Sequence, residues 1–114
     1  MSSKKYQFYG LVSSDNMGEI RYVGVTSRTI NQRFSQHKYC ATHPNQRGLP
    51  VHKWMWSVYQ KGGKIIPKLI DECEENCWEE REIYWIDYYR KHSKNLLNID
   101  KGGHGVITSK KKIY

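Results

Sequence analysis

The pattern of apolar and polar positions divides the start of the chain into two strands and a turn. Residues 7–12 and 20–26 are rich in β-branched and aromatic side chains, and residues 13–18 between them are dense in turn formers. This pattern predicts a β-hairpin. A third apolar run, residues 65–70, contains Pro67, which has no backbone N–H to donate to a sheet. We therefore expect that run to form an edge strand, or a strand that starts beyond the proline.

Three other segments have the periodicity of helices. In residues 30–38, ring and aliphatic side chains recur every three or four positions, directly after a hydroxyl-rich stretch, residues 26–29, that offers N-caps. Residues 50–60 begin with a proline, which fits the first turn of a helix, and two glycines follow shortly after them. Residues 78–91 carry an apolar stripe at about 100° per residue. The pattern thus predicts three strands and three helices.

The length and the cysteine content limit the class of protein. A chain of 114 residues has room for one compact domain with one core. We place this domain at residues 1–105 and a basic tail at residues 106–114. The chain has no apolar run of about 18 residues and no apolar stretch near its start, so we expect an intracellular, cytoplasmic protein without membrane segments. The odd number of cysteines, three, favours reduced thiols.

Positive charge is concentrated in the first part of the chain. Residues 1–70 contain eleven lysines and arginines and two acids, a balance of 11 − 2 = +9, whereas most of the remaining acids lie between Asp71 and Asp87. A basic half that is also rich in aromatic residues favours a surface that binds a polyanion such as a nucleic acid. The alternative interpretation is a small basic protein whose charge serves solubility alone.

One acidic residue, Glu82, falls on the wrong side of its helix. On a helical wheel it lies within the apolar stripe, between Trp78 and Trp85, whereas Glu79 and Glu80 lie off the stripe. An ionised carboxylate among tryptophans costs several kcal/mol of desolvation unless a partner compensates it. Two partners fit this position, a structural arginine or a hard divalent cation such as Mg²⁺. A cation bound by a single carboxylate keeps positions open for a phosphate oxygen and a water.

Arg33 and His37 lie four residues apart on the first helix, so both side chains share one face and can reach one substrate together. A guanidinium can stabilise the charge of a phosphoryl transition state, and an imidazole can exchange a proton near neutral pH. The alternative is a solvated helix face with no catalytic role. A structural zinc site offers another use for His37, together with Cys40, Cys73 and Cys77, whose spacings fall within the loose range of zinc ligands.

Together these residues resemble the GIY-YIG nuclease superfamily, which is named for two strand motifs that each carry a tyrosine. The two motifs correspond here to Gln7-Phe8-Tyr9 and Tyr22-Val23-Gly24. An arginine and a histidine four apart on the next helix are similar too, as is a glutamate followed by aromatic residues in a later helix, here within Arg81–Ile86. An asparagine beyond that helix, Asn98, completes the resemblance, which spans nearly the whole chain.

The resemblance implies a small α/β (α+β) domain with a three-stranded antiparallel sheet flanked by helices. It also implies a role for each matching residue. Glu82 would hold the metal, Arg33 would stabilise the transition state, and Tyr9 would help to activate the attacking water. Tyr22 and His37 would complete the hydrogen-bonded site, and Asn98 would support it. Intrinsic acidity favours His37 over Tyr9 as the base, because free tyrosine has a pKa of about 10 and histidine one of about 6.5, but a nearby cation can reverse that order.

The resemblance further implies a DNA endonuclease that depends on Mg²⁺, with Mn²⁺ able to substitute, and needs no small-molecule cofactor. It is closest to homing endonucleases of phages and bacteria, whose nuclease module is usually joined to a specificity domain, so specificity here would come from such a domain or from a partner protein. The basic residues expected to contact DNA are Arg28, Lys38, Arg47 and Lys53. The alternative hypothesis is a non-catalytic nucleic-acid-binding module. Glu82 argues against this alternative, because a protein that only binds nucleic acid gains nothing from a core-facing carboxylate. Likewise, cross-strand packing is the alternative role for the two strand tyrosines.

Overall fold

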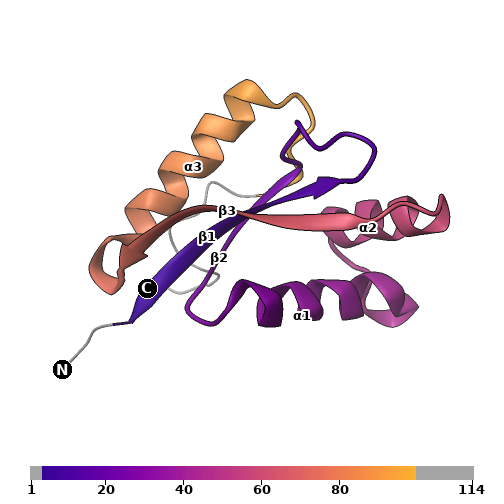
Figure 1. Ribbon diagram of the computed structural model, residues 1–114, viewed down its shortest axis with the longest axis horizontal. Helices are drawn as coiled ribbons and strands as arrows, with labels where there is room; N and C mark the ends of the chain where they lie inside the picture. The colour runs from indigo at the N-terminus through magenta and orange to yellow at the C-terminus, as the bar shows by residue number, and fades with distance from the viewer. Residues whose placement is uncertain (1–3, 100–114) are drawn as a thin grey trace.

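The computed structural model of the protein describes residues 4–99, so the start and end of the expected domain and the expected tail at residues 106–114 lie outside the described part. The described chain folds into a sheet and three main helices (Figure 1). The strands are β1 (Lys5–Ser13), β2 (Tyr22–Thr26) and β3 (Ile65–Glu74). The helices are α1 (Ile30–Thr42), α2 (Pro50–Gln60) and α3 (Trp78–His92), with single 3₁₀ turns η1 (Pro44–Gln46) and η2 (Glu75–Cys77).

The sheet has the order β2-β1-β3, and both pairings are antiparallel. The predicted hairpin is confirmed, with Gln7 opposite Thr26 and Leu11 opposite Tyr22. The second strand starts at Tyr22 and not at Ile20. The expected fold class, a three-stranded antiparallel sheet flanked by helices, is therefore confirmed.

Strand β3 lies at the edge of the sheet, which confirms the first of the two predicted alternatives. It starts before Pro67, which lies opposite Leu11 on the central strand. The strand also runs further than predicted, to Glu74, because its polar second half pairs with Lys5–Phe8. The apolar pattern ended at Ile70, but backbone pairing on a solvent-exposed edge does not require apolar side chains.

The outer edge of β2 is covered by the segment that follows α3. The backbone N–H of Leu97 donates to the carbonyl oxygen of Arg21 over 2.6 Å. The side-chain amide of Asn98 then bonds both backbone groups of Val23, accepting from its N–H and donating to its carbonyl, each over 2.8 Å. This segment thus satisfies backbone groups that an exposed edge would leave unpaired.

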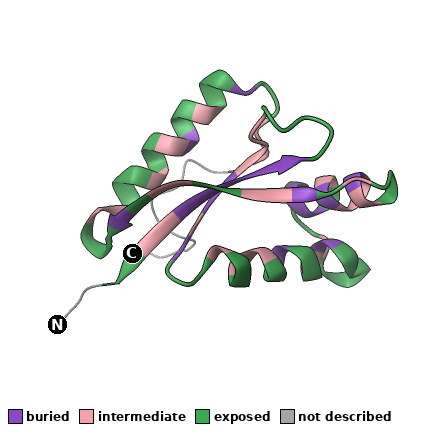
Figure 2. Ribbon diagram, viewed as in Figure 1, coloured by how far each residue is buried: buried purple, intermediate pink, exposed green. Residues whose placement is uncertain are grey.

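The helices enclose the sheet from two sides, with α1 and α2 on one side and α3 on the other (Figure 1). Helix α1 begins at a capping box, in which the Thr29 hydroxyl accepts from the backbone of Gln32 and the Gln32 side chain accepts from the backbone of Thr29. Burial is concentrated on the central strand and on the inward faces of α1 and α2 (Figure 2). None of the helices among residues 4–99 combines the length and apolarity that a membrane span needs.

Candidate functional site

Tyr9 lies at the centre of the site, on the middle strand of the sheet, and its side chain is fully buried. Its partner across the hairpin is Gly24. A Cβ atom at that position would overlap the phenol ring carbons and the hydroxyl of Tyr9. The tyrosine ring therefore extends over the neighbouring strand only because residue 24 has no side chain, which gives a packing reason for the glycine of the Tyr22-Val23-Gly24 motif.

His37 meets Tyr9 from helix α1. The Tyr9 hydroxyl oxygen and His37 Nε2 are 2.7 Å apart, and only 2 % of the histidine surface is exposed. Burial, followed by the positive charge of Arg33, lowers the pKa of His37 to about 3, so the imidazole is neutral at physiological pH. Burial also raises the pKa of the Tyr9 phenol, which therefore keeps its proton. The pair is a neutral hydrogen bond between a phenol and an imidazole.

A second buried histidine, His52 on α2, extends this pair and was missed from the sequence. Its Nε2 atom lies 3.1 Å from Nδ1 of His37, and 6 % of its surface is exposed. The signal that could have found it is the one that singled out Glu82, because His52 lies on the inward face of its helix beside Val51 and Met55. A polar ring at such a position requires a hydrogen-bond partner.

Arg33 and Tyr22 approach the same phenol. Arg33 is half-buried on α1, and its charge and hydrogen bond with Tyr9 oppose the rise in the phenol pKa that burial causes. One of its guanidinium nitrogens also donates to the Gln36 side chain over 2.7 Å. The ring of Tyr22 packs against that of His37 edge to face, with centroids 5.3 Å apart. The four predicted side chains of the hairpin and α1 therefore form one cluster.

Glu82 lies on the inward face of α3, as its position in the sequence predicted. The residues of this helix that are not exposed are Trp78, Glu82, Trp85, Ile86 and Tyr89. The carboxylate is half-buried and is close enough to Tyr9 for its negative charge to raise the pKa of the phenol. The structure thus brings the acid of α3 into the same electrostatic environment as the tyrosine of β1.

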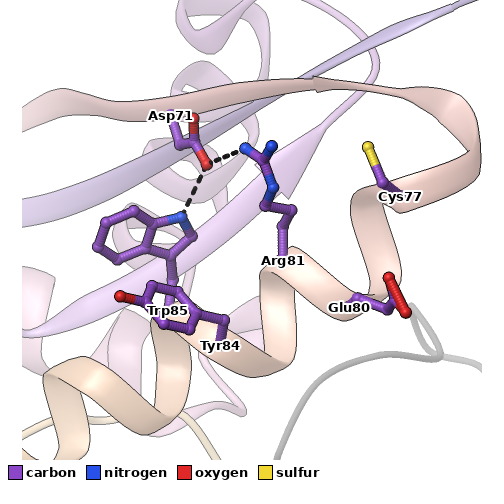
Figure 3. Close-up of a pocket in the computed structure, with 6 residues that line it drawn as sticks. All are labelled: Asp71, Cys77, Glu80, Arg81, Tyr84 and Trp85. Atoms are coloured by element: carbon purple, nitrogen blue, oxygen red, sulfur yellow. Dashed lines mark hydrogen bonds and ion pairs between the residues drawn. The ribbon is translucent and has the colours of Figure 1, made fainter.

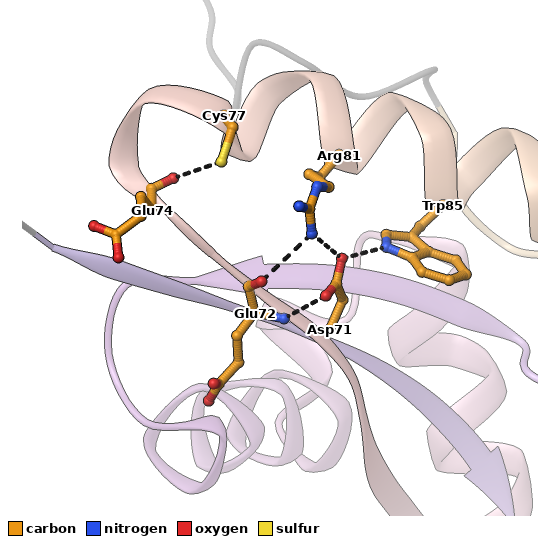
Figure 4. A network of polar contacts seen from close by, with 6 residues as sticks. All are labelled: Asp71, Glu72, Glu74, Cys77, Arg81 and Trp85. Carbon is orange, nitrogen blue, oxygen red and sulfur yellow. Dashed lines mark hydrogen bonds and ion pairs between the residues drawn. The ribbon is translucent and has the colours of Figure 1, made fainter.

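The position of α3 against the sheet is fixed by Asp71 on β3 (Figure 3). One carboxylate oxygen of Asp71 accepts from the Arg81 guanidinium over 2.6 Å and from the Trp85 indole over 2.9 Å. Arg81 also donates to the Glu72 carbonyl oxygen (Figure 4). Although burial opposes it, the bonds from Trp85 and Arg81 hold the pKa of the Asp71 carboxyl below its ordinary value. These contacts hold the part of α3 that carries Glu82 against β3.

The side chain of Asn98 bonds the backbone of β2. Its amide is engaged with the backbone of Val23, between Tyr22 and Gly24. Both hydrogen bonds hold the strand that carries these two motif residues. The Asn98 amide therefore holds the backbone of the second motif.

The described side chains do not form a multidentate metal centre. Among residues 4–99 no group of three or more histidine, cysteine, aspartate or glutamate side chains is arranged to hold a metal ion. The interpretation of His37, Cys40, Cys73 and Cys77 as zinc ligands is thus wrong, because His37 is engaged by Tyr9 and His52 inside the core. A single inward carboxylate, Glu82, still fits Mg²⁺, which takes few protein ligands and keeps several waters.

The four residues expected to contact DNA differ in their surroundings. Arg28, Lys38 and Lys53 are exposed. Arg47 is half-buried, donates through Nε to the Ala41 carbonyl oxygen over 2.7 Å, and stacks 4.4 Å above the Trp56 ring. It therefore also stabilises the connection between α1 and α2.

Comparison with known proteins identifies one family. The model of the family described as the GIY-YIG catalytic domain matches residues 5–97, well over half of the chain. Neither the curated proteins nor the solved structures give a match.

Proposed function

The chain belongs to the GIY-YIG family of nuclease domains, and from that premise we propose that it is a metal-dependent endonuclease that hydrolyses phosphodiester bonds of DNA. The observation that carries the proposal is the convergence on Tyr9 of His37, Arg33 and Glu82, which come from two helices on opposite sides of the sheet. This arrangement fits hydrolysis of a phosphodiester, because it combines the positive charge of Arg33, the negative charge of Glu82 and the phenol of Tyr9.

Arg33 is the group that binds the scissile phosphate. Its guanidinium presents several donors to phosphate oxygens and stabilises the extra negative charge of the pentacovalent transition state. A bound phosphate also offsets the charge of Arg33, one of the causes that lower the pKa of His37. Substrate binding therefore makes His37 more basic than it is in the free protein.

Tyr9 activates the attacking water, and His37 accepts the proton of the Tyr9 phenol. Because both ring nitrogens of His37 are engaged, Nε2 by the phenol and Nδ1 by His52, the group left to meet the water is the Tyr9 hydroxyl. A proton of the water passes to the Tyr9 oxygen while the phenol proton passes to Nε2 of His37. The resulting hydroxide attacks phosphorus, the bond between phosphorus and the leaving oxygen breaks with its electron pair passing to that oxygen, and the leaving oxygen takes a proton from a solvent water.

Glu82 would hold the divalent cation, Mg²⁺ by preference and Mn²⁺ as a substitute. The bound cation would supply Lewis-acid stabilisation of negative charge on the phosphate oxygens. Glu82 itself would provide the carboxylate for such a cation, and the bonds of Arg81 and Trp85 to Asp71 hold its helix against the sheet. No other carboxylate is needed for this role.

The proposed substrate is DNA, in the manner of a homing endonuclease. The exposed side chains of Arg28, Lys38 and Lys53 supply phosphate contacts that do not depend on base sequence. Sequence specificity then requires a further domain or a partner protein. Contacts of this kind predict an affinity that falls steeply with salt concentration.

Incubation of the purified protein with supercoiled plasmid tests the proposal. Nicked or linear DNA is expected with Mg²⁺ or Mn²⁺, and none with EDTA. A Tyr9→Phe preparation, purified in the same way, controls for contaminating nucleases. Retention of the plasmid on the protein without cleavage at any metal concentration would identify a non-catalytic binding module and overturn the proposal.

A further inference from the structure

His52 extends the tyrosine and histidine pair into a directional chain of hydrogen bonds. A phenol O–H is a stronger donor than the N–H of a neutral imidazole, and the bare imidazole nitrogen is the stronger acceptor, so the Tyr9 hydroxyl is the donor in its contact with His37. The phenol proton then has Nε2 of His37 as its acceptor, 2.7 Å away. A neutral imidazole that accepts at Nε2 carries its proton on Nδ1, which lies 3.1 Å from Nε2 of His52.

The direction of this chain determines the state of His52 as well. Its Nε2 must accept, so its own proton lies on Nδ1. This Nδ1 atom is buried and has no hydrogen-bond partner among the described residues. A buried donor left unpaired destabilises the folded protein. A polar ring kept at a buried position at that cost indicates that it serves a purpose other than stability.

We propose that His52 is a positioning residue of the nuclease site, which holds His37 in the tautomer that leaves Nε2 free to take the proton of Tyr9. The role resembles that of the acid in a serine protease triad, which orients a histidine without reacting itself. The effect of His52 on DNA cleavage rests on the proposed function. Its orientation of His37 rests on the hydrogen bonds alone.

Lowered pKa values favour the neutral form of both histidines, so the tautomer of each ring decides which nitrogen donates. Burial and the charge of Arg33 lower the pKa of His52, and the same two causes lower that of His37. If the protons lay the other way round, His37 would donate to Tyr9 through Nε2. His37 could then not take the phenol proton at Nε2, and activation of water through His37 would fail.

Two substitutions separate the hydrogen bond from the bulk of the ring. In His52→Gln the amide oxygen can take the place of Nε2 and accept from Nδ1 of His37. In His52→Leu no acceptor remains. His43→Leu is the matched control, because His43 is an exposed histidine at the end of α1 whose ring bonds only local groups of that helix end.

The experiment measures two quantities on the full chain. The first is the tautomer of His37, read from the ¹⁵N chemical shifts of its ring nitrogens in the free protein, which needs no catalysis. We expect the Nδ1–H form in the wild type, in His52→Gln and in His43→Leu, and a shift toward the Nε2–H form in His52→Leu. The second is the single-turnover rate of plasmid nicking, which we expect to fall by about 10- to 100-fold in His52→Leu and to be largely restored in His52→Gln.

An Nε2–H form of His37 in the wild type would overturn the proposal, and so would a His52→Leu protein with unchanged tautomer and rate. Equal loss of activity in His52→Gln and His52→Leu, with native circular dichroism in both, would also contradict it. If His52→Leu does not fold, the ¹⁵N spectra of the wild type and of His52→Gln still show whether His37 carries its proton on Nδ1. A wild type with the expected tautomer but no nuclease activity would refute the proposed function and leave the role of His52 in orienting His37 intact.

Discussion

The hydroxyl of Tyr9 and the Nε2 atom of His37 lie 2.7 Å apart across the interface between β1 and α1, with both side chains buried. This contact joins a residue of the first motif to a residue of the first helix. Together with the bond from His37 Nδ1 to His52, it leaves both ring nitrogens of the histidine engaged, so in the proposed mechanism the histidine is not the group that meets the water.

Removal of the phenol oxygen tests this relationship. Tyr9→Phe should lower the single-turnover cleavage rate by roughly 10² to 10⁴, the range expected for loss of a general base. DNA affinity should stay within a few-fold of the wild type, because the phenylalanine ring fills the same space. A rate close to that of the wild type would remove Tyr9 from the proton path. Cleavage and filter-binding assays on one oligonucleotide duplex measure both quantities.

The glycine opposite Tyr9 provides an independent test. Gly24→Ala should reduce turnover by about 10², because the added methyl group overlaps the phenol and displaces it by an amount of the order of an ångström. Gly18→Ala is the matched control, since a Cβ there meets nothing within 4 Å. Equal rates for the two variants would show that the close packing of Tyr9 on residue 24 is not required for catalysis.

Arg33 should act on the transition state, and the exposed basic residues on binding. We expect Arg33→Ala to lower the rate at saturating DNA by roughly 10² to 10⁵. Arg28→Ala should leave that rate unchanged, weaken binding, and reduce the slope of log affinity against log salt by about 1. If Arg33→Ala stays within a few-fold of the wild type at saturation, its guanidinium does not stabilise the transition state.

The low pKa of His37 predicts how stability depends on pH. In the unfolded chain the pKa of histidine is about 6.5, whereas in the folded protein that of His37 is about 3. Between these values the unfolded state binds a proton that the folded state does not, so stability falls as pH falls, by about 1.4 kcal/mol per unit from this residue. Urea unfolding at pH 6.5, 5.5 and 4.5 measures the slope.

Two variants separate the contribution of His37 to this pH dependence from that of the other titratable groups. The slope should be smaller in His37→Gln and unchanged in His43→Gln, because His43 is exposed. Asp71 contributes separately, since its lowered pKa affects stability only in more acidic solution. Identical slopes in all three proteins would mean that His37 is not held neutral by the fold.

The sequence predicted the helices and the inward position of Glu82 because both depend on local periodicity. The helical wheel placed this carboxylate on the buried face of α3 before any tertiary contact was known, and its half-buried state agrees with that position. The end of β3 was predicted too early, since its last residues are held by backbone pairing with β1 and not by apolar burial. An apolar pattern carries no information about such pairing.

The contacts that complete the site depend on packing between distant segments. His52 meets His37 only because α1 and α2 lie against each other, and no spacing along the chain encodes that approach. Asp71 likewise binds residues ten and fourteen positions away across a turn. An inward polar residue is visible from the sequence, as His52 could have been, but the identity of its partner is not.

The decisive measurement is the rate of plasmid nicking by Glu82→Gln across a titration of Mg²⁺, with Glu80→Gln, an exposed neighbour on α3, as the control. Loss of the carboxylate should lower the rate at saturating metal by roughly 10² to 10⁴, equivalent to a few kcal/mol of transition-state stabilisation, with circular dichroism and DNA affinity unchanged. Glu80→Gln should cleave like the wild type. A Glu82→Gln protein that nicks DNA at the wild-type rate with the same dependence on Mg²⁺ would contradict a metal-dependent nuclease site built on this residue.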